Sequence, residues 1–173
     1  MNVITKIEVQ KKNPKRCSIY INEEFAFGMD IDALGIYNIQ KGNIYSEEEY
    51  ASLLYDLQYE KAKYVALKYI GYSPRTKQQV IQKLQSSEYD EMIIDKTIDF
   101  LEEYQYINDM EYAKNYIANR IQHKKQGRQK IIYDLIQKGI NRWTIEPILE
   151  EYKEKEYESA LYLYDKRAKG KTQ

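Results

Sequence analysis

Five basic side chains lie close together in this chain, with no acidic side chain among them. They are Arg120, Lys124, Lys125, Arg128 and Lys130. The hydrophobic spacing predicts that one helix ends and another begins within this stretch, so the five side chains would converge on one bend. Such groups bind phosphates or the carboxylates of a partner, with an affinity that falls as salt rises. We call residues 120–130 the basic elbow and predict that it binds an anionic partner.

The alternative for these cations is a purely structural role. Basic side chains near the C-terminus of a helix complement its dipole and stabilise it by about 0.3–1 kcal/mol each. This alternative explains Lys124 and Lys125 well. It explains Arg128 and Lys130 poorly, because they lie at the start of the following helix, where the dipole disfavours cations.

The charge of the whole chain is balanced, with 27 basic and 27 acidic residues. A mainly acidic stretch, residues 146–158, follows the basic elbow. Two opposite patches in one small protein suggest a polar docking surface, and ordinary solvated helix faces are the alternative. The 19 tyrosines likewise leave two interpretations open, which are anchoring or base stacking at an interface and the filling of half-buried positions.

Histidine and cysteine, two residue types common in catalytic sites, occur once each. His123 is the only histidine, so a metal site with several histidines cannot form within the chain, and its place beside Lys124 and Lys125 favours a surface role over general-base catalysis. Cys17 lies among apolar residues of a predicted strand, which favours a buried structural thiol. The phosphate-binding patterns GxxxxGK[ST] and GxGxxG are absent from the sequence. The sequence therefore predicts a protein that is not an enzyme and indicates neither a cofactor nor a metal.

Composition predicts a protein of the cytoplasm. The mean hydropathy is −0.77, and no apolar run approaches the roughly 20 residues of a membrane-spanning helix. The first residues lack the apolar core of a signal peptide. A single cysteine fits a reducing compartment.

An internal repeat organises most of the chain. Shifting the sequence by 51 residues aligns the stretch after residue 108 with residues 60–101 without a gap. The identical pairs include Glu111 with Glu60, Ala113 with Ala62, Lys114 with Lys63, Ile121 with Ile70, Gln129 with Gln78, Leu135 with Leu84 and Ile145 with Ile94. Each copy is too small to bury a sizeable core alone, so we expect the copies to stack.

The first copy, residues 46–107, reads as three helices. Ser46 with Glu49 has the spacing of a capping box, and the first helix is expected to end at Gly71. Ser73 followed by Pro74 predicts the start of the second helix. Asp90 is placed to cap the third.

The second copy, residues 108–153, repeats this pattern around the basic elbow. Asn108 is expected to cap the first helix, and Gly139 to end the second in a left-handed conformation. Pro147 places the start of the third between residues 141 and 144, or else kinks it. A third copy begins near Lys155, and residues 154–173 hold only its first helix.

Residues 1–45 carry strand signals. We predict a small three-stranded antiparallel meander with turns at Asn13–Pro14 and near Asn22–Glu23, followed by a short helix or turn over residues 30–42. Alternation places three apolar side chains of the second strand on one face and two phenylalanines of the third on one face. These residues are Cys17, Ile19 and Ile21, and Phe25 and Phe27.

The order and spacing of these motifs resemble the RecX family of regulatory proteins, which act on the RecA recombinase. In the second copy the family pattern is carried by Asp109, Tyr112–Ala113, Tyr116–Ile117, Arg120, Gly127 with Ile131, and Leu135 with Gly139–Ile140. In the first copy it is carried by Ala66, Ser73 and Leu84, with Tyr106–Ile107 before Asn108–Asp109. The resemblance covers residues 59–152, and the meander resembles an extra segment that some members carry.

The resemblance implies a mainly α protein whose tandem three-helix repeats form an elongated curved array. It further implies a monomer that binds RecA filaments on single-stranded DNA and damps their ATP hydrolysis, strand exchange and coprotease action. A helical module that binds DNA directly is the alternative, and a plain helical scaffold is a weaker third reading. The departure from the family pattern is the third repeat, of which only one helix is present.

Overall fold

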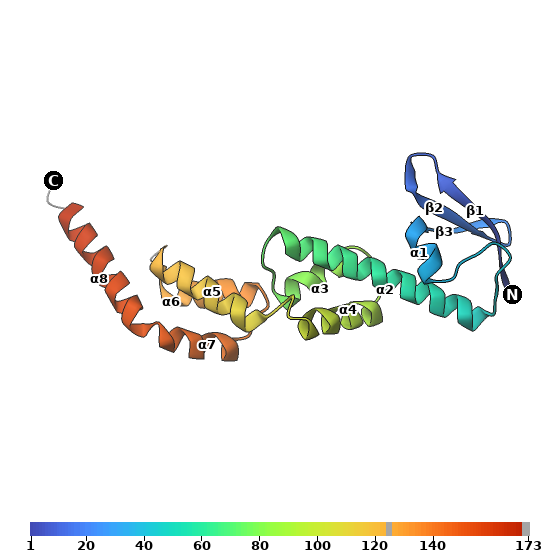
Figure 1. The fold of residues 1–173 in the computed structure, drawn as a ribbon. Helices are drawn as coiled ribbons and strands as arrows, with labels where there is room; N and C mark the ends of the chain where they lie inside the picture. Colours follow the sequence, from blue (N-terminus) through green and yellow to red (C-terminus); the bar gives the residue numbers. More distant parts are fainter. Residues whose placement is uncertain (124–125, 171–173) are drawn as a thin grey trace. The chain divides into compact units, whose positions relative to one another are not determined.

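The computed structural model describes residues 1–123 and 126–170. It is mainly helical, with a small antiparallel sheet at the N-terminus and three-helix groups after it (Figure 1). The fold class expected from the sequence is thereby confirmed. Two compact units are present, Met1–Leu57 and Gln58–Gln173. Among the described residues, no helix is both long and apolar enough to cross a bilayer.

The sheet has four strands rather than three. They are β1 (Asn2–Gln10), β2 (Asn13–Ile21), β3 (Glu24–Asp30) and β4 (Ile44–Tyr45), in the order β3-β2-β1-β4. The β2–β3 turn lies where the sequence predicts it, because Asn22 and Glu23 both have the positive φ of a two-residue hairpin turn. The Asn13–Pro14 turn is wrong. Gln10 pairs with Asn13, so Lys11 and Lys12 make the turn and Pro14 lies near the start of β2, where a strand tolerates proline.

One face of the sheet forms the core of the first unit. Cys17, Ile19 and Ile21 point into it as expected, together with Phe27. Phe25 is 61% exposed, so the prediction that it shares a face with Phe27 is wrong. The pairing of β2 with β3 shifts register between Ile19 and Tyr20. This bulge turns Phe25 to the other face, where its ring meets Tyr20 edge-on at 6.0 Å.

Helical elements complete this unit. Helix α1 (Ile31–Ile36) follows β3, and helix α2 (Glu47–Tyr72) starts after β4. The Ser46 hydroxyl accepts a hydrogen bond from the amide of Glu49, and the Glu49 carboxylate accepts one from the amide of Ser46. The predicted capping box is confirmed. Leu53 and Leu57, from the first half of α2, are buried in the same core.

The first three-helix group is α2 with α3 (Lys77–Gln85) and α4 (Glu91–Glu103). The start of α3 predicted at Ser73–Pro74 is wrong by three residues. Thr76 and Gln79 form the capping box instead, which leaves residues 73–75 as a loop. Asp90 caps α4 as expected, accepting a hydrogen bond from the amide of Ile93.

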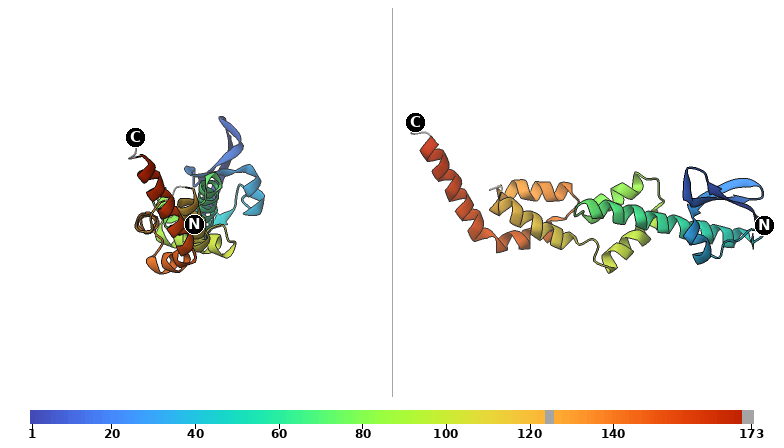
Figure 2. Two further views of the ribbon diagram at one scale, coloured as in Figure 1. Left: turned by 90° about the vertical axis from the view of Figure 1, so that its left-hand side faces the viewer. Right: turned by 45° about the horizontal axis from the view of Figure 1, so that its top comes forward.

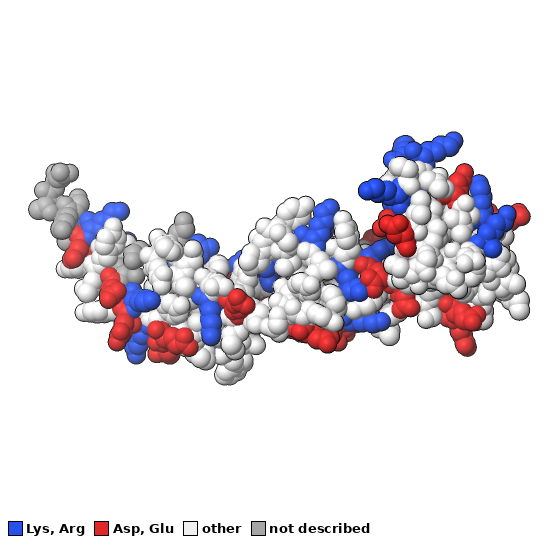
Figure 3. Space-filling view, viewed as in Figure 1, with Lys and Arg blue, Asp and Glu red and all other residues white. Residues whose placement is uncertain are grey.

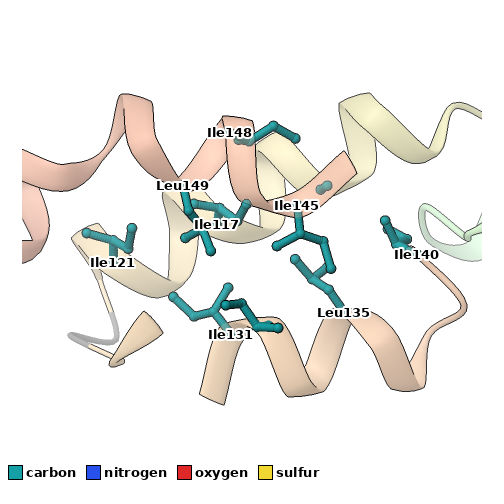
Figure 4. Close-up of a cluster of buried hydrophobic side chains, with 10 residues drawn as sticks. Ile117, Ile121, Ile131, Leu135, Ile140, Ile145, Ile148 and Leu149 are labelled. Atoms are coloured by element: carbon teal, nitrogen blue, oxygen red, sulfur yellow. The ribbon is translucent and has the colours of Figure 1, made fainter. Parts of the chain in front are cut away.

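The second group is α5 (Asp109–Gln122), α6 (Arg128–Gln137) and α7 (Arg142–Glu151). Asn108 caps α5, and Gly139 has φ +85° after α6, both as predicted. Helix α7 begins within the predicted range, with Asn141 as its cap and Pro147 inside the helix. Figure 4 shows the apolar side chains of the three helices meeting in one core. Its buried members are Ala113, Ile117, Ile121, Ile131, Ile132, Leu135, Ile140, Ile145, Ile148 and Leu149.

Helix α8 (Lys153–Gly170) follows α7 directly and leaves the three-helix group at that end (Figure 2). It corresponds to the predicted first helix of a third repeat. Its large apolar residues Tyr157, Leu161, Tyr162, Leu163 and Tyr164 are all exposed. In α5, the equivalent helix of the second group, the inward residues are covered by α6 and α7.

Candidate functional site

The basic elbow connects α5 to α6. Helix α5 ends at Gln122 with His123 as its C-cap, and α6 begins at Arg128 after the N-cap Gly127. Lys124 and Lys125, two of the five predicted site residues, lie outside the residues that the structure describes. Arg120, Arg128 and Lys130 can therefore be placed, and each has a partner within the chain.

Arg120 packs against an aromatic ring. It is half-buried, and its guanidinium carbon lies 4.6 Å from the centre of the Tyr116 ring, one turn earlier in α5. The Tyr116 hydroxyl donates a hydrogen bond of 3.0 Å to the Asp134 carboxylate. Burial, followed by this hydrogen bond, raises the pKa of Tyr116 above its usual value. Arg120 is thus held in place by stacking rather than by a carboxylate.

The two cations at the start of α6 are paired with acids. Arg128 Nη2 lies 2.7 Å from Glu150 Oε1 of α7, and Lys130 Nζ lies 2.6 Å from Asp134 Oδ1, one turn further along α6. The hydrogen bond from Lys130 lowers the pKa of Asp134. The helix dipole does not account for cations at the start of α6. The two carboxylates do, because each stabilises one of these cations.

The basic elbow is therefore less positive than the sequence between residues 120 and 130 indicates. Its acids come from later in the chain, residues 134 and 150. In Figure 3 the cations of the helical unit are interspersed with acidic side chains on the visible face. Partly exposed pairs of this kind contribute little to stability, so they can exchange for a partner's carboxylates or phosphates at little cost.

The two residues considered for catalysis, Cys17 and His123, lie in different environments. The Cys17 side chain is fully buried, its thiol lies 3.6 Å from the carbonyl oxygen of Met29, and burial raises its pKa. His123 is exposed at the end of α5. Within the described part of the chain, no group of three or more histidine, cysteine, aspartate or glutamate residues could hold a metal ion.

A tight joint between the two three-helix groups was not visible from the sequence alone. The Thr76 hydroxyl donates a hydrogen bond of 2.6 Å to the carbonyl oxygen of Lys138, which caps α6. Asp109, the first residue of α5, accepts a 2.8 Å hydrogen bond from the amide of Lys77. Residues of the second group thus complete the N-terminus of α3 in the first.

Gly139 belongs to the same joint. A Cβ atom at this position would overlap the side chain of Gln78, so glycine is required by close packing as well as by its positive φ. The sequence signal for this approach was the glycine after α6, which could be read as a helix terminator but not as a contact site.

A cleft of about 440 Å³ opens beside this joint. One wall is the end of α2 and the loop that follows it, residues 70–75, and the other is the loop 105–108 with the first turns of α5. Arg75 and Glu111 are the charged residues that line it, and tyrosines 72, 106 and 112 are its aromatic residues. Sequence reasoning did not single out this cleft.

Comparison with known proteins agrees with the three parts of the structure. Family models described as the RecX N-terminal domain, the RecX first three-helix domain and the RecX second three-helix domain match residues 2–46, 62–101 and 108–148. The chain is 28% identical to a crystal structure of regulatory protein RecX, with a TM-score of 0.70 over 98% of this chain and 85% of the other. A RecX structure from Lactobacillus salivarius has a TM-score of 0.64, at 30% identity over 66% of this chain and 75% of the other.

Curated relatives lead to the same assignment. The chain is 39% identical to the regulatory protein RecX of Clostridioides difficile over 96% of its own length and 79% of that protein. For the RecX of Clostridium tetani the identity is 41%, over 84% of this chain and 67% of the relative. These are regulatory proteins, which agrees with the expected non-enzymatic role. The chain belongs to the RecX family of regulatory proteins.

Proposed function

We propose that this chain binds filaments of the RecA recombinase on single-stranded DNA and lowers their ATPase, strand-exchange and coprotease activities. The observation that carries the proposal is membership of the RecX family across the sheet and both three-helix groups. The setting is the cytoplasm, and the chain acts as a monomer. In this proposal, residues 1–45 form an accessory β part, and residues 46–107, 108–153 and 154–173 form two complete repeats and one partial repeat.

In this proposal the basic elbow forms a charged edge of the surface that binds the RecA filament. Arg120, Arg128 and Lys130, with Lys124 and Lys125 between them in the sequence, supply cations close to a filament that carries both acidic side chains and phosphates. The pairs that Arg128 and Lys130 form are partly exposed, which supports their exchange on binding. Rim charges of this kind govern association rate and salt dependence more than final affinity.

The test is inhibition of the RecA ATPase that single-stranded DNA stimulates. Inhibition by the wild-type chain supports the proposed function, and its absence at saturating concentration contradicts it. Combining Lys124→Glu, Lys125→Glu and Arg128→Glu is expected to weaken inhibition, most strongly at low salt. A matched control reverses Lys11, Lys12 and Lys15, three exposed cations of the sheet unit. Equal inhibition by both triple variants would remove the elbow from the proposed surface.

Direct binding to DNA is the second candidate function. One observation favours it, the cations of the basic elbow. Titration of the chain with single- and double-stranded DNA in the absence of RecA, repeated at several salt concentrations, separates the two. Tight, salt-sensitive binding without RecA would favour the DNA-binding reading. Binding that requires the RecA filament would favour the regulator.

A further inference from the structure

The cleft beside the joint contains an arginine without an acidic partner. Arg75 lines the cleft, and its guanidinium carbon lies 4.2 Å from the centre of the Tyr69 ring. Its Nε–H is buried and has no hydrogen-bond partner among the described residues. Within that same part of the chain, Arg75 forms no salt bridge. The Tyr69 ring thus holds the guanidinium in place, while its Nε–H has no acceptor among the described residues.

The internal repeat explains why Arg75 lacks a partner. Under the shift of 51 residues, Arg75 corresponds to Gln126, and Asp134 corresponds to Lys83. In the second repeat the Gln126 side chain donates to the Asp134 carboxylate at 3.3 Å. In the first repeat a lysine stands where that acceptor would be. Compared with the second repeat, an arginine replaces the glutamine donor and a lysine replaces the aspartate acceptor.

The missing acceptor identifies the class of ligand. An arginine can donate from two of its nitrogens to one carboxylate together, in the paired geometry that makes such contacts strong. Glu111 lines the same cleft, so a chain of closely spaced negative charges, such as a nucleic acid backbone, would meet repulsion there. A single carboxylate fits the charge pattern better than a polyanion.

The walls of the cleft add a preference for an apolar side chain beside that carboxylate. Tyr72 is 75% exposed and Tyr106 is 49% exposed, and both line the cleft. Exposed tyrosines next to an arginine are the residue types that dominate binding energy at protein interfaces. A peptide segment offers both features, because it can place an apolar residue next to an aspartate or glutamate.

We propose that this cleft is the anchor point for an acidic peptide segment of the partner, with Arg75 binding one carboxylate and the tyrosines binding a neighbouring apolar side chain. The proposal rests on the proposed function for the identity of that partner as the RecA filament. The basic elbow, at the opposite end of α5, is then a separate contact, and Arg75 provides the contact with the largest effect on affinity.

The first test measures the affinity of the full chain for RecA filaments on single-stranded DNA by biolayer interferometry. Arg75→Ala is expected to weaken binding about 30-fold, the loss from which an interface residue counts as a hot spot. Arg75→Lys is expected to restore only part of this loss, because lysine lacks the planar donor pair. Glu111→Gln is expected to tighten binding about 2- to 5-fold by removing the repulsion.

The matched control is Arg142→Ala, which removes an exposed arginine that pairs with Glu146 on α7. Circular dichroism melts establish that each variant is folded at the assay temperature. If Arg75→Ala binds as well as Arg142→Ala while the wild-type chain binds tightly, the inference about the cleft is overturned and the proposed function stands. If the wild-type chain does not bind the filament at all, the proposed function is overturned instead.

A second test decides on the cleft in either case. The Nε–H resonance of Arg75 is followed by NMR in the ¹⁵N-labelled chain during titration with an acetylated Leu-Asp-Leu peptide and with its Leu-Asn-Leu counterpart. A shift with the aspartate peptide that is absent with the asparagine peptide supports the site. No shift at millimolar peptide, or equal shifts with both peptides, overturns it.

Discussion

The two turns between the first and second helices of the repeats occupy equivalent positions and differ in how their charges are used. The basic elbow of the second repeat is rich in cations, and Arg128 and Lys130 are each paired with an acid of the same chain. The corresponding stretch of the first repeat, residues 69–79, has two cations: Lys77 is paired with Glu102 of α4, and Arg75 forms no salt bridge among the described residues. The number of charges in a stretch of sequence is therefore a poor guide to the charges available to a partner.

The difference arises from what surrounds each turn. In the second repeat, carboxylates from α6 and α7 reach the cations. In the first, groups of the next repeat complete the N-terminus of α3, namely the carboxyl group of Asp109 and the carbonyl of Lys138, and Lys77 pairs with Glu102 of α4. Arg75 stacks on Tyr69 instead, and no carboxylate among the described residues pairs with it.

The largest expected effect tests whether the two repeats are comparable as folded units. Leu135 and its counterpart Leu84 are both fully buried. Leu135→Ala and Leu84→Ala are each expected to lower the free energy of unfolding by about 2–5 kcal/mol. Urea denaturation followed by circular dichroism measures both. Because the joint connects the repeats, we expect one shared transition, and two separate transitions would show that they unfold independently.

The next effect tests the joint itself. Gly139→Val is expected to destabilise the chain by about 2–4 kcal/mol, from the left-handed backbone and the overlap with Gln78. Gly127→Ala in the basic elbow is the control, because Gly127 has φ −73° and open space around its position for a Cβ. A loss of more than about 1 kcal/mol in the control would mean that the elbow is as tightly constrained as the joint.

A smaller effect is expected when the first repeat receives a carboxylate at the position equivalent to Asp134. Lys83→Asp places a carboxylate where Asp134 stands in the second repeat, within reach of Arg75 if the turns are equivalent. Affinity for the RecA filament should fall about 3- to 10-fold while Arg75 itself is unchanged, a cost of about 1 kcal/mol. Lys114→Asp, an exposed position on α5, controls for the change in net charge.

The smallest effects concern two carboxylates whose pKa values shift in opposite directions. Burial is the main cause that raises the pKa of Asp109 above 3.8, so its protonation stabilises the fold, fully below pH 3.8 and less as pH rises through the raised value. The hydrogen bond from Lys130 lowers the pKa of Asp134, so its ionisation stabilises the fold above pH 3.8 and less as pH falls through the lowered value. Carboxyl ¹³C NMR titration should place Asp109 above Asp134, and the reverse order would contradict both assignments.

Local signals were sufficient to predict most elements of the fold. The capping box of Ser46, the caps Asp90 and Asn108 and the left-handed Gly139 are set by residues within a few positions. Where two local signals compete, tertiary contacts decide. Ser73–Pro74 has a good start signal, but α3 begins after Thr76, whose hydroxyl also bonds across the joint.

The candidate site was less predictable, because its properties depend on contacts between distant residues. Glu150 reaches Arg128 from 22 positions away, which no inspection of the elbow sequence reveals. The bulge that exposes Phe25 is likewise set by pairing between two strands. A signal for Arg75 did exist in the repeat itself, where a glutamine–aspartate pair becomes an arginine–lysine pair.

The hydrogen bond from Thr76 to Lys138 limits how such a protein can change its length. The second repeat completes the first turn of helix α3. We therefore expect the first repeat to lose stability when the second repeat is removed or exchanged. A unit inserted behind it would have to bring its own acidic residue where Asp109 stands and its own glycine where Gly139 stands. An array that grows by duplication must therefore add each new repeat on the C-terminal side. The new repeat must supply the groups that complete the second helix of the repeat before it.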